Sequence, residues 1–241
     1  MMIDKYIFSS CGGYEINEDC ANGAVYESGA AFVLADGLGG HGNGDVASAF
    51  VVESLLEALG EQSDAACEEQ LREKIAATNA ALVALKKEKL LRMKSTVVAL
   101  QICGNTAAWA NVGDSRLYFI HNSEIVSITE DHSVAFKKFA AGEISRADIA
   151  TDDDQSSLLR ALGNEECSKI DTNSTDALEP ADAFFLCSDG FWENVKDEEI
   201  LFDYLKADTA QEWAEGLLLK VKKRMPADND NLSFICVKLC N

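Results

Sequence analysis

The sequence has few of the residues that build zinc, disulfide or membrane proteins. Its 241 residues include only two prolines and three histidines, and no run approaches the roughly 18 apolar residues of a membrane-spanning helix. The eight cysteines are scattered without a C-x-x-C pair, so we expect reduced thiols and no zinc site. The N-terminus, MMIDKYIFSS, lacks the basic start and long apolar core of a signal peptide. We therefore expect a cytoplasmic protein.

Positive charge is also scarce. Lys and Arg number 21 against 41 Asp and Glu, which gives a formal net charge of −20. Such a field repels nucleic acid and anionic lipid, so we expect neither as a partner. An apolar fraction of 47% predicts a folded core. Because no repeat or low-complexity tract occurs, we expect a single domain over residues 1–241.

Apolar runs predict short strands and three long helices. The strands are expected at Lys5–Cys11, Ala31–Ala35, Thr96–Ile102, Ala107–Val112, Arg116–His121, Ile125–Ile128, Ala183–Cys187 and Leu232–Leu239. The helices are expected at Val46–Leu59, at Asp64–Leu91 behind Ser63 as N-cap, and between Ala210 and Lys223. Since strands cluster in hairpins, with a tight turn at residues 121–124, and no β-α-β alternation occurs, we expect stacked antiparallel sheets flanked by helices. The polar segment 133–163 is expected to form a flap-like excursion.

A glycine-rich loop raises the question of nucleotide binding. Gly37-Leu38-Gly39-Gly40-His41-Gly42 matches G-x-G-x-x-G and lies between an apolar run and an expected helix. A dinucleotide site also needs an acid after a second strand about 20 residues further on, and that region reads as helix. Asp36 would place a carboxylate beside the phosphates, and no Lys or Arg occurs from Asp36 to Leu71. A nucleotide-binding oxidoreductase is therefore disfavoured.

Acidic residues recur at the ends of apolar strands. Ala-Phe-Val-Leu-Ala-Asp-Gly at 31–37 is echoed by Phe-Phe-Leu-Cys-Ser-Asp-Gly at 184–190. Gly113-Asp114, Asn17-Glu18-Asp19 and the run 228–231 (Asp-Asn-Asp-Asn) adjoin three further strands. One Asp-Gly alone is ordinary turn chemistry. Several carboxylates crowded together repel one another, and hard divalent cations relieve that repulsion.

The expected ligand set indicates which metal and which reaction. All-oxygen ligands without a His or Cys cluster favour Mg²⁺ or Mn²⁺. A glycine after a ligand Asp is expected to let the backbone turn so that its own carbonyl faces the metal. Two ions about 3.5–4 Å apart would hold a bridging water, lower its pKa and clamp a phosphate.

Taken together, the motifs resemble the metal-dependent protein serine/threonine phosphatases of the 2C type, in their short bacterial form. They occur in the family's order and span nearly the whole chain. The matching segments are Asn17-Glu18-Asp19, residues 35–41 (ADGLGGH), residues 44–48 (GDVAS), Ser95-Thr96, residues 110–116 (ANVGDSR), residues 129–133 (TEDHS), residues 159–163 (LRALG), Ser188-Asp189-Gly190 and residues 230–233 (DNLS). The resemblance implies an α+β fold, a four-layer α-β-β-α sandwich of two antiparallel sheets flanked by helix pairs.

The resemblance also implies roles for individual residues. Asp36 would bridge two Mn²⁺ or Mg²⁺ ions, with Asp189 and Asp230 completing one. Glu18 and the Gly37 carbonyl would serve the other, partly through waters. Asp114, with Asp189, would support a third, weaker ion, and Asp19 would accept a hydrogen bond from metal-bound water.

The implied activity is hydrolysis of phosphoserine and phosphothreonine in protein substrates. A hydroxide that bridges the two ions would attack the phosphate without a covalent intermediate. The resemblance further implies a monomer in signal transduction, opposed by a cognate serine/threonine kinase. Residues 133–163 would correspond to the family's variable flap, which influences substrate choice.

Two positions depart from the family pattern. Tyr14 stands where an arginine commonly holds the substrate phosphate, and a hydroxyl cannot replace a bidentate guanidinium, so we expect weaker phosphate binding. Leu38 follows Asp-Gly where some members carry a histidine general acid. His41 is a candidate substitute, but a role in the glycine loop is favoured, with a metal-bound water as proton donor. Arg116 is expected to form a structural ion pair.

Other function classes are weaker. No cysteine begins a C-x5-R signature, so a cysteine-nucleophile phosphatase is excluded, and the G-x-S-x-G nucleophile elbow is also absent. A phosphatase-like binding module that has lost turnover remains the alternative, because Tyr14 replaces the phosphate-binding arginine.

Overall fold

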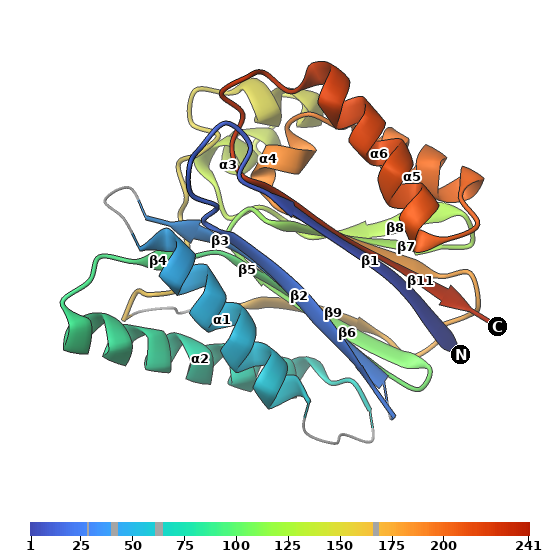
Figure 1. The fold of residues 1–241 in the computed structure, drawn as a ribbon, viewed down its shortest axis with the longest axis horizontal. Helices are drawn as coiled ribbons and strands as arrows, with labels where there is room; N and C mark the ends of the chain where they lie inside the picture. Colours follow the sequence, from blue (N-terminus) through green and yellow to red (C-terminus); the bar gives the residue numbers. More distant parts are fainter. Residues whose placement is uncertain (28, 40–42, 61–64, 166–168) are drawn as a thin grey trace.

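Two antiparallel sheets pack face to face in the computed structural model (Figure 1), which describes residues 1–27, 29–39, 43–60, 65–165 and 169–241. In its described residues, one sheet has five strands in the order β1-β11-β10-β7-β8, and the other has six, in the order β2-β3-β5-β6-β9 with β4 beside β3. The first sheet comprises β1 (Met2–Ser10), β7 (Arg116–His121), β8 (Glu124–Ile128), β10 (Ala183–Cys187) and β11 (Leu232–Cys240). The second comprises β2 (Asp19–Tyr26), β3 (Gly29–Leu38), β4 (Lys94–Ser95), β5 (Val97–Cys103), β6 (Thr106–Val112) and β9 (Asp171–Thr175).

Helices cover the outer face of each sheet. In Figure 1, α1 (Gly44–Leu59) and α2 (Glu68–Lys89) lie on the β2–β9 sheet, whereas α5 (Asp197–Lys206) and α6 (Ala210–Arg224) lie on the other. Shorter elements are α3 (Val134–Ala140), the 3-10 helix η1 (Arg146–Thr151) and α4 (Asp189–Trp192). The expected four-layer α-β-β-α sandwich is therefore confirmed.

Both faces of the central strands are buried. Along β3, Phe32 and Leu34 point between the two sheets, and Ala31 and Val33 point to the helices α1 and α2. This alternation follows the two-residue period of a strand, with apolar neighbours on each side. It explains why β3, β5 and β10 read in the sequence as continuous apolar runs, although their sheets are antiparallel.

The predicted elements agree with the structure where the strands are central. Arg116–His121 and Ala183–Cys187 are observed with the expected bounds. In the predicted hairpin, Asn122 and Ser123 have φ values of 50° and 63°, as a two-residue type I′ connection requires. The predicted start of the second helix was wrong: α2 begins at Glu68 after Cys67, and Ser63 lies outside the described residues.

The sequence did not predict β2, β4, β9 and the helices α3, α4 and α5. β2 and β9 are the two edges of their sheet, and both are polar, since β2 contains Asn22 and Gly23 and β9 reads Asp-Thr-Asn-Ser-Thr. Edge strands need only one neighbour and one buried face, so their sequences carry a weaker apolar signal.

Segment 133–163 leaves the sheets after β8 and returns before β9. It contains α3 and η1, and isolated β-bridges Ser133↔Leu158 and Ser95↔Leu162 fix its ends. Lys138 forms ion pairs of 2.7 Å with Asp152 and 2.8 Å with Asp154, which accounts for part of the acidic run in this segment. Among the described residues, every helix is too short or too polar to cross a lipid bilayer.

An ion pair between α5 and α6 gives a test of this packing. Arg224 donates to both carboxylate oxygens of Glu199, at 2.6 and 2.8 Å, and this contact lowers the pKa of Glu199 to about 2. A depressed pKa stabilises the fold above the unfolded-state pKa, and the stabilisation is lost as the pH falls toward the folded-state value. Because both groups are partly exposed and screened, we expect Glu199→Gln to cost about 1 kcal/mol at pH 7.

Chemical denaturation at pH 7 and at pH 3.5 measures this difference. The cost of Glu199→Gln should shrink at pH 3.5, whereas a cost that is constant across this range would contradict the ion-pair account. Glu198→Gln, in the same turn of α5, is the matched control, since Glu198 has no ion pair among the described residues.

Candidate metal centre

Six acidic residues named from the sequence gather at one edge of the sandwich. The sheet registers bring them there: Asp19 of β2 lies opposite Asp36 of β3, and the end of β1 at Ser10 lies opposite Leu232, just after Asp230. Asp189 follows β10 and Asp114 follows β6. The chain termini lie together at the other end of β1, where Met2 pairs with Cys240 (Figure 1).

The charges of these carboxylates act on one another. Repulsion on Asp36 comes from Asp19, Asp114, Asp230 and Glu18. Repulsion on Asp189 comes from Asp36, Asp114 and Asp230, and also from Glu193, which the sequence did not single out.

The pKa values of the inner carboxyls are raised. Burial is the largest cause in each case, and charge repulsion is the second cause for Asp36, whose pKa lies well above the ordinary value. Burial and then the charge of Asp36 do the same to the pKa of Asp189. Burial also raises the pKa of Asp114 to about 7 and that of Asp19 to about 6. The fold therefore holds several acids in an environment that disfavours their charge.

Hydrogen bonds with Ser95 and Thr96 hold the main chain of Asp36 in place. Its amide donates to the Thr96 hydroxyl at 2.9 Å, and its carbonyl accepts from the Thr96 amide at 2.8 Å and the Ser95 hydroxyl at 3.0 Å. The Thr96 hydroxyl contacts that of Ser115 at 2.8 Å. With its main chain fixed on both sides, the Asp36 side chain has a defined place, and part of it remains exposed to solvent.

The glycine after Asp36 permits close packing rather than a turn. We expected a sharp turn at Gly37, but this was wrong, because β3 continues through Leu38. The Gly37 amide donates to the Glu18 carbonyl at 3.0 Å, and a Cβ atom at Gly37 would overlap the Gly44 carbonyl. The Ser48 hydroxyl also donates to the Glu18 carbonyl, at 2.5 Å. Three segments thus meet at backbone distance around Glu18.

The start of α1 argues against a nucleotide. The Gly44 amide, at the first turn of α1, donates to Glu18 Oε1 at 3.2 Å. A carboxylate of the protein therefore already occupies the position where a pyrophosphate would lie at this helix N-terminus. Gly40, His41 and Gly42 lie outside the described residues, so the predictions for His41 stay predictions.

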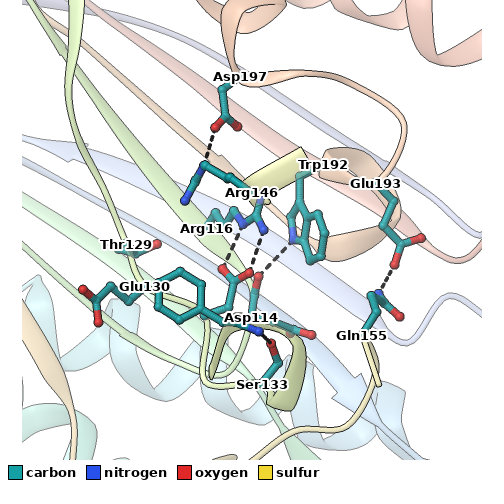
Figure 2. A network of polar contacts seen from close by, with 12 residues as sticks. Asp114, Arg116, Thr129, Glu130, Ser133, Arg146, Gln155, Trp192, Glu193 and Asp197 are labelled. Atoms are coloured by element: carbon teal, nitrogen blue, oxygen red, sulfur yellow. Dashed lines mark hydrogen bonds and ion pairs between the residues drawn. The ribbon is translucent and has the colours of Figure 1, made fainter. Parts of the chain in front are cut away.

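Asp19 and Asp114 are buried and incompletely paired. Asp19 Oδ2 accepts from the Ser188 hydroxyl at 2.8 Å, whereas Asp19 Oδ1 has no hydrogen-bond partner among the described residues. Asp114 accepts from the Trp192 indole at its carbonyl, at 3.0 Å, while its Oδ1 is unpartnered within the described chain (Figure 2). Buried acceptors without partners are costly, and each of these is an oxygen that a cation could satisfy.

Arg116 forms a buried ion pair and stacks on Trp192, the residue that binds the Asp114 carbonyl. Its guanidinium donates to both oxygens of Asp131, at 2.8 and 2.6 Å, and lies 3.7 Å from the centroid of the Trp192 ring (Figure 2). Both members of the ion pair are buried. The predicted structural ion pair of Arg116 is therefore confirmed, and through Trp192 it is linked to Asp114.

Segment 133–163 contacts two acidic residues of the main body, Asp197 and Glu193, of which Glu193 interacts with the carboxylates of the centre (Figure 2). Arg146 Nε donates to Asp197 at 2.7 Å, and the same carboxylate accepts from the Tyr118 hydroxyl at 2.8 Å. Gln155 donates to Glu193. Burial is the largest cause that raises the pKa of Glu193, to about 7, and the charge of Asp230 is the second. Glu193 therefore interacts with the same group of carboxylates.

The sequence motifs contain Ser188 and Asn231 without assigning them a role, and they leave out Trp192 and Glu193. In the structure Ser188 donates to Asp19, Trp192 donates to the Asp114 carbonyl, Asn231 accepts from the Glu18 amide, and Glu193 adds a negative charge close to Asp189. Each lies within four residues of Asp189 or directly beside Asp230, so proximity to the motifs was the available signal. What each one contacts depends on the fold.

The residues present fit divalent cations. Their side-chain oxygens are hard ligands of the kind that Mg²⁺ and Mn²⁺ prefer, and two buried oxygens have no other partner in the described chain. Among the described residues, no three acidic, imidazole or thiol groups already converge into a ligand shell.

The crowding predicts an unusual effect of removing a charge. Because the pKa of Asp36 is raised, this acid destabilises the fold at pH values above its unfolded-state pKa, and the penalty vanishes as the pH falls below that value. With chelator at pH 7, Asp36→Asn should raise the free energy of unfolding by about 1–3 kcal/mol.

Thermal and denaturant unfolding check this expectation. Mn²⁺ at about 100 times its dissociation constant should add about 2.7 kcal/mol to the wild-type protein for each ion bound, and less to Asp36→Asn. The exposed Asp176→Asn is the control, with no change in either condition. An Asp36→Asn protein that is less stable with chelator would contradict the account of repulsion.

Comparison with known proteins identifies the family. The family model described as Protein phosphatase 2C matches residues 14–222. The chain is 34% identical over 232 residues to the serine/threonine phosphatase stp of Listeria welshimeri, covering 92% of this chain and 90% of the relative. It is 30% identical over 187 residues to the serine/threonine protein phosphatase PstP of Mycobacterium tuberculosis, covering 77% and 35%.

Solved structures agree. The crystal structure of the Mycobacterium tuberculosis serine/threonine phosphatase PstP/Ppp has a TM-score of 0.86 at 27% identity and covers 100% of both chains. The catalytic domain of PstP in complex with two manganese ions has a TM-score of 0.84 at 27% identity, over 99% of both chains. With its sandwich and its edge of carboxylates, this chain belongs to the protein phosphatase 2C family.

Proposed function

We propose that this protein hydrolyses phosphoserine and phosphothreonine esters in protein substrates, with divalent cations held by the carboxylates at the sandwich edge. The observation that carries the proposal is the gathering of Glu18, Asp36, Asp114, Asp189 and Asp230 at one edge. It is supported by the serine/threonine phosphatase names of the relatives and by the two manganese ions of the PstP complex.

Each residue has a part in holding the cations. Asp36 would lie between two ions, Asp189 and Asp230 would complete one, and Glu18 with the Gly37 carbonyl would serve the other. Asp114, together with Asp189, would hold a third. When bound, such ions lower the pKa of water and neutralise phosphate oxygens, which supplies a nucleophile for ester hydrolysis.

The protein's own groups orient water and exclude other chemistry. The Ser188 hydroxyl donates a hydrogen bond to one carboxylate oxygen of Asp19, so its second oxygen can accept a hydrogen bond from water at the centre. Because the Ser95–Thr96 contacts fix the backbone of Asp36, the charges that face the substrate stay in place during the reaction. Segment 133–163 adjoins the same carboxylates through the contact of Gln155 with Glu193, and we propose it as the flap that influences substrate choice.

Hydrolysis of a phosphothreonine peptide by the purified protein tests the function. Turnover should appear with Mn²⁺ or Mg²⁺ and disappear with chelator. Asp189→Asn should lose about 100-fold or more in kcat, whereas Asp176→Asn should keep wild-type turnover, because Asp176 is exposed and follows β9 at the end of the sheet opposite Asp114. A folded protein that binds Mn²⁺ and turns over no phosphopeptide would contradict this proposal, and would favour a phosphatase-like binding module.

Tyr14 gives a second test at the same centre. It lines a cavity with Glu18 and Asp230, so an arginine at this position would add a cation beside the expected phosphate. We expect Tyr14→Arg to lower the KM for 4-nitrophenyl phosphate about tenfold, since charge-assisted bonds to phosphate are roughly twice as strong as neutral ones, with little change in kcat. Tyr14→Lys, a point charge without the bidentate fork, should lower it less. An unchanged KM in both variants would show that this position does not face the phosphate.

A further inference from the structure

A cavity of about 490 Å³ opens beside the carboxylates. Its walls are Tyr14, Glu15, Ile16, Glu18, Asp230 and Asn231. Glu18 and Asp230 belong to the candidate metal centre, so the cavity and the centre share a wall. Whatever binds at the centre with its phosphate therefore has its neighbouring atoms at this cavity.

The loop that carries Tyr14 and Ile16 is held by Asn231. The Asn231 side-chain amide donates to the carbonyls of Cys11 at 2.9 Å and Ile16 at 3.1 Å, and its Oδ1 accepts from the Glu18 amide at 2.6 Å. Asn231 itself is buried, 6% exposed. One side chain thus fixes both ends of the loop on the segment that precedes β11.

Close backbone packing fixes the loop further. A Cβ atom at Gly12 would overlap the Asp230 carbonyl, and one at Gly13 would crowd the Ala227 carbonyl. The Gly13 amide donates to the Asn229 carbonyl at 2.8 Å. The loop therefore presents its side chains from a main chain that has little freedom to move, which lowers the entropic cost of binding.

Two apolar side chains stand exposed on this fixed loop. Tyr14 is 57% exposed and Ile16 is 58% exposed. The charged residues that line the cavity are all acidic, namely Glu15, Glu18 and Asp230, and no Lys or Arg of the described residues lines it. An apolar wall next to carboxylates suits an uncharged apolar group and repels an acidic one.

We propose that this cavity binds an apolar side chain that flanks the phosphorylated residue of the protein substrate. This inference rests on the proposed phosphatase function. Adjacent residues of an extended peptide are about 3.3–3.6 Å apart along the chain, so a flanking Leu or Phe reaches the wall that adjoins Glu18 and Asp230. The Tyr14 ring and the Ile16 side chain would contact it, and Glu15 would disfavour Asp or Glu at the same place.

Two sets of phosphothreonine peptides test the proposal. In each set the residue on one side of the phosphothreonine is Leu, Ser, Arg or Glu, and kcat/KM is measured with Mn²⁺. In one of the sets the wild-type protein should prefer Leu to Ser by about tenfold, a typical discrimination for an apolar pocket, and should prefer both to Glu. A preference for Arg over Leu, or equal values in both sets, would overturn it.

Variants of Tyr14 and Ile16 test whether these side chains cause the preference for Leu. Tyr14→Ala and Ile16→Ser should each reduce the preference for Leu to about two- to threefold. Tyr14→Phe, which keeps the ring and removes the hydroxyl, should retain it. Val126→Ser, on β8 and 51% exposed, is the matched control and should also retain it. Loss of the preference in the control, or its survival in both Tyr14→Ala and Ile16→Ser, would contradict the assignment.

Binding distinguishes failure of this inference from failure of the proposed function. The same peptides are titrated into the Mn²⁺-loaded protein by calorimetry, and 4-nitrophenyl phosphate reports hydrolysis of a substrate with no flanking residue. Absence of turnover with every substrate, together with a tenfold tighter binding of the Leu peptide, would refute the phosphatase function and keep the apolar subsite. Turnover of 4-nitrophenyl phosphate with no preference among peptides in rate or affinity would refute the subsite alone.

Discussion

Mutual repulsion of carboxylates at one edge of a β-sandwich is the constraint on which this structure depends. Asp36, Asp114 and Asp189 are each raised in pKa by burial and by one or more neighbouring acids. The fold tolerates this cost because the groups around them are fixed: Ser95 and Thr96 hold the Asp36 backbone, Ser188 holds Asp19, and Trp192 holds the Asp114 carbonyl. A site that is unfavourable when it is charged and without cations is well prepared to bind cations.

The sandwich supplies the rigidity that the edge requires. Apolar layers lie between the sheets and under each helix pair, so the central strands that lead to Asp36, Asp114 and Asp189 are buried on both faces. A slip of a strand by one residue would turn its apolar side chains to the wrong face, so the strand register is strongly fixed. The register in turn fixes which residues reach the edge. The loops at the edge are tied to one another by Asn231 and by glycines with no room for a Cβ atom. The exposed Tyr14 and Ile16 are presented on this fixed frame.

The sequence predicted the central part of the fold and the acids, and it failed where tertiary contacts decide. β10 and β7 were predicted with their observed bounds because their apolar runs are buried on both faces. The edge strand Asp171–Thr175 is polar and is held in the sheet by its pairing with β6, so no apolar pattern in its own sequence predicts it. The acids Asp36 and Asp189 were found by an echo between two strand ends. The contacts of Trp192 and Asn231 were not predicted, because the groups that they contact lie 78 and up to 220 residues away in the chain. The turn expected at Gly37 was wrong because the glycine serves close packing against Gly44.

Calorimetric titration of the chelator-treated protein with Mn²⁺ tests the central claim most directly. The account predicts at least two ions per chain, with release of protons on binding, because acids with raised pKa values must lose them to act as ligands. The heat should therefore differ between buffers of different ionisation enthalpy. Failure to bind Mn²⁺, or binding of a single ion without proton release, would contradict the assignment of this edge as the metal centre of the enzyme.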